Sequence, residues 1–176
     1  EYLSGNVRRK LAEAEAACML DPRYQLNVDR LRAVLPRDLM SDEIDVALGQ
    51  SWIPPDDVTG FIHNLLDIQG YRSDSIKANY IPEAGKWVVD TDVDFKRYHE
   101  DRHQNKREWG TPRFGAHELI DMALNGKLPT AYDTEGDGEK TVKVVNQGET
   151  LAAREMQAKI QEEFKKWLWR DPDRGD

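Results

Sequence analysis

The sequence predicts an α+β fold that is mostly helical, with two small β-hairpins and a long C-terminal helix. Three observations support this prediction. Apolar residues recur at steps of three and four in several segments, which is the period of an amphipathic helix. Two other segments contain short apolar runs separated by turn residues, which is typical of a β-hairpin. The last apolar stripe is also the longest, and it extends over about residues 148–169.

Two helices are expected before residue 36. The first covers about residues 7–20, with Ser4 as its N-cap, and it ends at Asp21-Pro22 because proline lacks the N–H that a helix interior needs. The second carries apolar residues from Val28 to Leu35 and ends before Pro36.

The next segments suggest a winged-helix outline. Ser41 is expected to cap a short helix that ends at Gly49, and residues 54–57 open another helix with a continuous apolar face. Residues 76–89 then form a hairpin around Pro82-Glu83-Ala84-Gly85. Together with the preceding helix, these elements outline a winged-helix-like portion over about residues 27–90. The helix after residue 54 carries no lysine or arginine through Asp67, so we do not expect it to read DNA bases.

The second half begins with a polar, irregular segment at residues 90–110. A short helix follows from Gly115 to Leu124 and stops at Asn125-Gly126. Tyr132 and residues 141–145 form the second hairpin, and the C-terminal helix comes last. We divide the chain into a helical region with a hairpin at residues 1–92 and a second region at residues 93–176, expected to form one compact unit. The apolar stripe of the last helix contains Ala153, Met156, Ile160, Phe164 and Trp167.

Composition limits the classes of function. Acidic residues number 33 and basic residues 25, giving a formal charge of -8. This charge disfavours general coating of nucleic acid but allows a local basic patch. The single cysteine, Cys18, excludes an intrachain disulfide and favours the cytoplasm. The sequence contains no apolar run of about 18 residues, so no membrane partner is expected. We expect the chain, which begins at Glu1, to be a segment of a longer protein.

Residues 99–103 read HEDRH and fit the zinc-hydrolase pattern H-E-x-x-H. Two histidines at this spacing can hold zinc on one face of a helix, but the helix must be buried to shape a dry cleft. The surrounding residues are polar, and a third ligand is missing at any recognised spacing. We therefore interpret His99 and His103 as surface histidines on a solvated turn, and a zinc-dependent hydrolase as a remote alternative.

A second metal pattern is weaker. Residues 133–138 begin like a calcium-binding EF-hand loop, but its last position, which should be glutamate, is Val144. We interpret the glycines here as turn residues. No phosphate loop or nucleophile elbow is present in the sequence, so we assign no catalytic residue and expect no cofactor in this segment.

Basic residues gather after residue 95 and alternate with aromatic residues such as Tyr98 and Phe114. Cations contact phosphates and aromatic rings can stack on bases, which makes this stretch a candidate for nucleic-acid binding. Acidic neighbours dilute it, so a solvated loop is the alternative interpretation. The candidate residues are Lys96, Arg97, Arg102, Lys106, Arg107, Trp109 and Arg113.

The end of the last helix is strongly apolar, with Trp167-Leu168-Trp169 in succession. Two interpretations stay open. Trp167 packs into the core while Trp169 is half covered, or this end docks onto an adjoining domain.

Several blocks together resemble one family of large proteins. These blocks are YLSGNVRRKL (2–11), DEIDVALGQSWIPPDDV (42–58), YIPEAGKWVV (80–89), GTPRFGAHELIDMALN (110–125) and ETLAAREMQAKIQEEFKKWLWRDPDR (149–174). They are similar to the segment ahead of the motor in Swi/Snf-type DNA helicases of plasmids, phages and integrative elements, which are often joined to an N6-adenine DNA methyltransferase. The ATP-binding and methyltransferase motifs of that family are absent from this sequence.

The resemblance implies a noncatalytic accessory domain that contacts DNA or positions an adjoining helicase motor. ATP and S-adenosylmethionine would then bind elsewhere in the parent protein. The alternative is a structural or protein-interaction linker without DNA contact.

Overall fold

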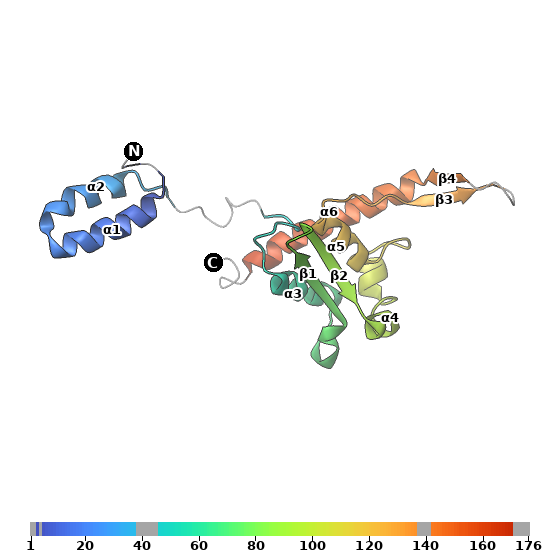
Figure 1. The fold of residues 1–176 in the computed structure, drawn as a ribbon. Helices are drawn as coiled ribbons and strands as arrows, with labels where there is room; N and C mark the ends of the chain where they lie inside the picture. The colour runs from blue at the N-terminus through green and yellow to red at the C-terminus, as the bar shows by residue number, and fades with distance from the viewer. Residues whose placement is uncertain (1–2, 4, 38–45, 137–141, 171–176) are drawn as a thin grey trace. The chain divides into compact units, whose positions relative to one another are not determined.

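The chain forms two compact units in a computed structural model that describes residues 3, 5–37, 46–136 and 142–170. The units are Glu1–Ile44 and Asp45–Asp176, and each is considered by itself (Figure 1). The division follows Ile44, whereas the sequence analysis placed it after residue 92. Residues on both sides of position 92 belong to one unit, and the Val89 N–H on β2 donates across that position to the Asp121 side chain at 3.0 Å.

The first unit is a helical hairpin. Helix α1 (Val7–Leu20) and helix α2 (Gln25–Ala33) are joined by the 3-10 turn η1 (Pro22–Tyr24) and pack along one apolar seam, as the sequence predicted. The N-cap of α1 is Asn6, whose side chain accepts from the Arg9 N–H at 3.0 Å. Ser4, which was expected in that role, lies outside the described residues. The buried seam consists of Val7, Ala14, Val28 and Leu31.

The second unit is built around the hairpin of strands β1 (Ile76–Ile81) and β2 (Lys86–Thr91), which pair antiparallel with Ile76 opposite Thr91. Helix α3 (Pro55–Leu66) packs on β1, and helix α5 (Ala116–Leu124) packs on β2. A two-stranded sheet is marginal in water because both of its edges expose unpaired backbone groups. Here the two helices supply the missing partners.

Each helix places two side chains, one helical turn apart, where they form hydrogen bonds with backbone groups of the neighbouring strand. On α3, Thr59 accepts from the Ala78 N–H at 2.9 Å, and His63 Nε2 donates to the Ile76 carbonyl at 3.0 Å. The partners on the β2 side are Asp121 and Asn125, which bind the backbone of Val89 and Trp87 at 3.0–3.1 Å. Side chains four residues apart lie on one helix face, so both helices are held in register with the sheet.

Helix α6 (Gln147–Trp169) supplies the other wall of the core. Phe61 of α3 makes edge-to-face contacts with Phe164 and Trp167, with ring centroids 5.1 and 5.8 Å apart. The predicted stripe is buried at four positions, with Met156 half-buried. Trp167 is buried and Trp169 is half-buried, which confirms the packing part of the interpretation of this end.

The second hairpin, of strands β3 (Tyr132–Glu135) and β4 (Val142–Val145), pairs antiparallel and is mostly exposed. The expected α+β architecture, with two small hairpins and a long last helix, is therefore confirmed. The calcium-like pattern coincides with strand β3 at residues 133–135, Gly136 has a positive φ of 141°, and Val144 lies on β4. Asp137 and Gly138 lie outside the described ranges.

Two local expectations differ from the structure. The described end of the expected helix at residues 41–49 is a turn, so the winged-helix outline lacks this helix within the described residues, and α2 and α3 belong to different units. Tertiary contact explains the turn, because Trp87 Nε1 donates to the Gly49 carbonyl at 3.2 Å. The segment 90–110 is not irregular but contains helix α4 (Val93–Tyr98) and the π-helix η4 (Gln104–Glu108). Within the described residues, no helix has the length and apolar character needed to cross a membrane.

Candidate nucleic-acid interface

Helix α4 presents the first part of the basic stretch to solvent. Asp92 begins the helix by accepting hydrogen bonds from the N–H groups of Asp94 and Phe95 at 2.8 and 2.9 Å. Phe95 is buried, so the opposite face of the helix is exposed to solvent. Lys96 and Arg97 lie on that exposed face.

A polar pocket of about 280 Å³ lies beside α4. Arg102 Nη1 donates to the Asp67 carbonyl at 3.2 Å and lies 3.3 Å from Nδ1 of the buried His99. Arg72, from the 3-10 segment η3 (Gly70–Ser75), lies over the Tyr98 ring with its guanidinium carbon 3.9 Å from the ring centroid. The pocket is lined by Asp67, Gln69, Arg72, His99 and Arg102.

The electrostatics of the pocket are positive. Burial lowers the pKa of His99, and the nearby charges of Arg102 and Arg72 lower it further. The Arg102 hydrogen bond requires Nδ1 of His99 to be the acceptor, so the neutral ring carries its proton on Nε2. Asp67 is the one non-glycine residue with positive φ within the described ranges, at 51°, which is a mildly strained conformation.

The HEDRH pattern does not form the geometry of a zinc site. Helix α4 ends at Tyr98, and residues 99–102 form a turn before the π-helix begins, so the two histidines do not share one face of a helix. His103 is exposed, as expected, but the expectation of a surface position was wrong for His99, which is only 5% exposed. Phe95 and Arg102 cover it, which the polar sequence around it did not indicate. Within the described ranges, no three histidine, cysteine or acidic residues gather as metal ligands.

Arg113 has a different environment from the other candidates. Its guanidinium pairs with Asp133 on β3 and with Glu149 on α6, where Nε lies 2.6 Å from the carboxylate, and it donates to the Tyr132 carbonyl at 3.1 Å. The bond to Asp133 raises the pKa of Arg113. These contacts attach the second hairpin to α6. The two carboxylates compensate the positive charge of Arg113, so little of it is left to attract a phosphate.

Lys106 and Arg107 lie on the π-helix and Trp109 follows it, and none of the three lines the pocket. Its buried residue, Asn105, binds the Glu100 carbonyl and His117 and so fixes the whole turn. Lys106 is half-buried and Arg107 exposed. Trp109 is half-buried, with the ammonium group of Lys159 on α6 4.7 Å from its ring centroid, so this cation already uses one face of the ring.

The candidate residues thus divide into three places, and the structure adds one residue that the sequence analysis missed. Lys96, Arg97 and Arg102 lie at α4 and its pocket. Arg72 joins them from the other side of the first hairpin. No local signal could have found Arg72, because a single arginine between Tyr71 and Ser73 has no distinctive pattern.

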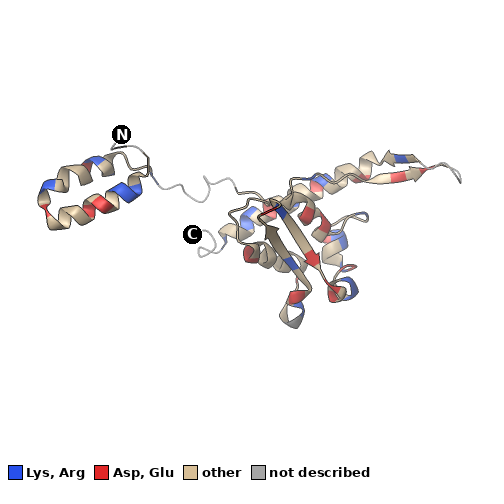
Figure 2. Cartoon of the chain, in the orientation of Figure 1, with Lys and Arg blue, Asp and Glu red and all other residues tan. Residues whose placement is uncertain are grey.

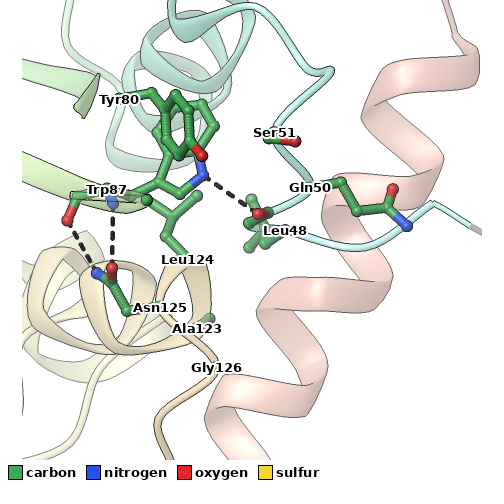
Figure 3. Close-up of a pocket in the computed structure, with 11 residues that line it drawn as sticks. Leu48, Gln50, Ser51, Tyr80, Trp87, Ala123, Leu124, Asn125 and Gly126 are labelled. Carbon is green, nitrogen blue, oxygen red and sulfur yellow. Dashed lines mark hydrogen bonds between the residues drawn. The ribbon is translucent and has the colours of Figure 1, made fainter. Parts of the chain in front are cut away.

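A second cavity, of about 550 Å³, lies between the first hairpin and the end of α5 (Figure 3). The Asn125 amide makes two hydrogen bonds to the Trp87 backbone, and the Trp87 indole donates to Gly49. The polar groups of Trp87 and Asn125 are therefore used within the fold, and none of the residues that line this cavity is charged. Because its hydrogen bonds are made within the fold and its lining is uncharged, we assign these residues a structural role.

Figure 2 shows basic and acidic residues mixed along the helices of both units, so the α4 region is a local feature of an acidic chain. No curated protein matches the sequence, and no solved structure matches the chain. A family model described as "Domain of unknown function (DUF8437)" matches residues 47–176, which is most of the chain and nearly all of its second unit. The chain therefore belongs to the DUF8437 family.

Proposed function

We propose that this chain is a noncatalytic accessory domain of a DNA helicase, or of a helicase joined to an N6-adenine DNA methyltransferase, from a mobile element. It would act in the cytoplasm and contact DNA beside the motor. ATP and S-adenosylmethionine would bind in other parts of such a protein. The resemblance of the sequence blocks supports the parent, and one structural observation supports DNA contact.

That observation is the convergence of cations from two separate segments at α4. Lys96 and Arg97 are exposed on the helix, Arg102 follows it, and Arg72 reaches it from η3. We name these four residues the α4 cationic surface. Cations that are held close together attract phosphates and release the counterions of DNA on binding.

The geometry favours contact with the DNA backbone over contact with bases. The Tyr98 ring is covered on one face by Arg72, and the Arg97 guanidinium carbon lies 6.0 Å from its centroid. A ring that already contacts arginine is less available for stacking on a base. We therefore expect binding that depends strongly on salt and weakly on sequence.

The test is a fluorescence anisotropy titration of the whole chain with single- and double-stranded DNA at low and moderate salt. The double variant Lys96→Gln/Arg97→Gln should weaken binding and lower the salt dependence by roughly two phosphate contacts. The matched control Lys127→Gln/Lys143→Gln removes the same charge from exposed positions outside the surface. Equal losses in the two double variants, or no binding at low salt, would contradict DNA contact.

A linker without DNA contact is the second candidate, and the first unit favours it. Met19 and Leu20 at the end of α1 are 89% and 90% exposed, and Leu26 nearby is 58% exposed. Large apolar side chains gathered at one turn are typical of a protein contact. If the linker function holds, Met19→Gln/Leu20→Gln should weaken association with the adjoining motor domain in a sedimentation assay, and the wild-type chain should not bind DNA.

A further inference from the structure

The pocket beside α4 combines two guanidinium groups that are held in place before any ligand arrives. Arg72 is held by the Tyr98 ring, and Arg102 is held by the Asp67 carbonyl and His99. The Asp67 carbonyl and the His99 ring are neutral acceptors. They hold the Arg102 guanidinium in position but do not compensate its positive charge. Preorganised guanidinium groups lose little freedom when they bind an oxyanion.

The pocket also contains an amide donor suited to a small anion. The Gln69 amide donates to the Asp67 carboxylate at 3.1 Å, which leaves its second N–H for another acceptor. Nε2 of His99 is buried and has no hydrogen-bond partner within the described part of the chain. Because this nitrogen has almost no accessible surface, His99 contributes to the pocket by holding Arg102 through Nδ1 and not as a donor to a ligand.

One group opposes an anion. The Asp67 carboxylate lines the same pocket and repels negative charge. The lining side chains carry a net positive charge, because they include two arginines, one carboxylate and the neutral His99, while the Asp92 carboxylate acts on His99 from outside the lining. Because the Asp67 carboxylate opposes an anion, its replacement by a neutral side chain should improve anion binding, which provides a test.

We propose that the pocket formed by Gln69, Arg72, His99 and Arg102 binds a single phosphate group. Its volume of about 280 Å³ accommodates one phosphate with its hydrogen-bonded shell. The identification of DNA as the source of that phosphate rests on the proposed function. The phosphate can be the terminal monoester of a strand or an internal diester.

The first experiment titrates the whole chain with inorganic phosphate and follows the His99 ring resonances by NMR, with calorimetry for the Kd. Saturable shifts are expected. Arg72→Gln and Arg102→Gln should each raise the Kd roughly tenfold, the loss of a charge-assisted hydrogen bond. Lys127→Gln, which removes an exposed cation outside both the pocket lining and the α4 cationic surface, should change the Kd by less than about twofold.

Asp67→Asn keeps a residue that tolerates positive φ and removes the opposing charge, so it should lower the Kd. A gain in affinity cannot arise from misfolding, so this variant decides the question if either arginine variant unfolds. Absence of saturable shifts, equal losses in Arg72→Gln and Lys127→Gln, or no gain in Asp67→Asn would overturn the proposal.

The second experiment uses oligothymidine of about ten nucleotides with a 5′-phosphate or a 5′-hydroxyl, and inorganic phosphate as competitor. Tighter binding of the phosphorylated strand would identify a strand end as the source, and equal affinity with competition would identify an internal phosphate. Phosphate binding without DNA binding would support the pocket and contradict the proposed function. DNA binding that inorganic phosphate and the pocket variants leave unchanged would support the proposed function and overturn the pocket.

Discussion

The side-chain oxygen of Asn105 accepts two hydrogen bonds from His117, one from the backbone N–H at 3.2 Å and one from ring Nδ1 at 3.0 Å. The amide nitrogen of Asn105 donates to the Glu100 carbonyl at 2.7 Å. Asn105 is 1% exposed, so these bonds are sheltered from water. One side chain thereby joins the turn after α4 to the start of α5 and fixes the segment on which the basic residues lie.

Replacement of this residue should therefore destabilise the second unit. Asn105→Ala leaves the Glu100 carbonyl and two donors of His117 without a partner, and we expect a loss of about 3 kcal/mol in the free energy of unfolding. Urea denaturation measures it. Asn79→Ala is the control, since Asn79 makes an exposed bond to Asp90 and should change stability by less than about 0.5 kcal/mol. Similar effects of the two substitutions would contradict the role of Asn105.

Gly49 permits a close approach that no other residue can make. Its φ is +96°, and a Cβ atom there would lie 2.3 Å from the Leu124 carbonyl oxygen. Gly49→Ala should lower the free energy of unfolding by about 2 kcal/mol or more. Gly85 also has positive φ, but no atom lies within 4 Å of where its Cβ would be, so Gly85→Ala should cost only about 1 kcal/mol. If both variants lost the same stability, the contact with Leu124 would be unimportant.

Two buried histidines should make stability depend on pH. Burial lowers the pKa of His117 and of His99, and for His99 the charges of Arg102 and Arg72 add to the effect. Below the ordinary histidine pKa of 6.5, the unfolded chain therefore binds protons that the folded chain does not. The free energy of unfolding should fall as pH decreases from about 6.5 through the lowered pKa values.

Thermal unfolding at a series of pH values tests this dependence. The double variant His99→Gln/His117→Gln should show a shallower slope than the wild type in that window. His103→Gln is the control, because His103 is exposed and should leave the slope unchanged. An unaltered slope in the double variant would assign the pH dependence to other groups.

Arg113 should act on the second hairpin and not on DNA. Arg113→Gln removes the ion pairs to Asp133 and Glu149, so the amides of β3 and β4 should exchange hydrogen faster while those of α3 and α5 keep their protection. Hydrogen exchange followed by mass spectrometry measures this difference. Lys143→Gln on β4 is the control. A loss of DNA affinity in Arg113→Gln, with unchanged hydrogen exchange of β3 and β4, would show that Arg113 binds DNA and would contradict this prediction.

Local pattern was sufficient for most elements of this fold. The apolar face of α3, the stripe of α6 and the two hairpins follow from the spacing of apolar and turn residues, since each element's period is a property of a few neighbouring positions. The spacing of apolar residues did not predict the helix and π-helix of the segment 90–110. These elements are held by Phe95 and Asn105, which are single buried residues within a polar stretch.

The sequence by itself determined an α+β chain, mostly helical, and membership of a family for which it retains matching residues from 47 to 176. Only the tertiary structure decided which basic residues act together. It placed Arg72 beside Tyr98 and Arg102, buried His99 and paired Arg113 with Asp133 and Glu149. The physical reason is that charge compensation and burial depend on partners far along the chain, which local periodicity does not encode.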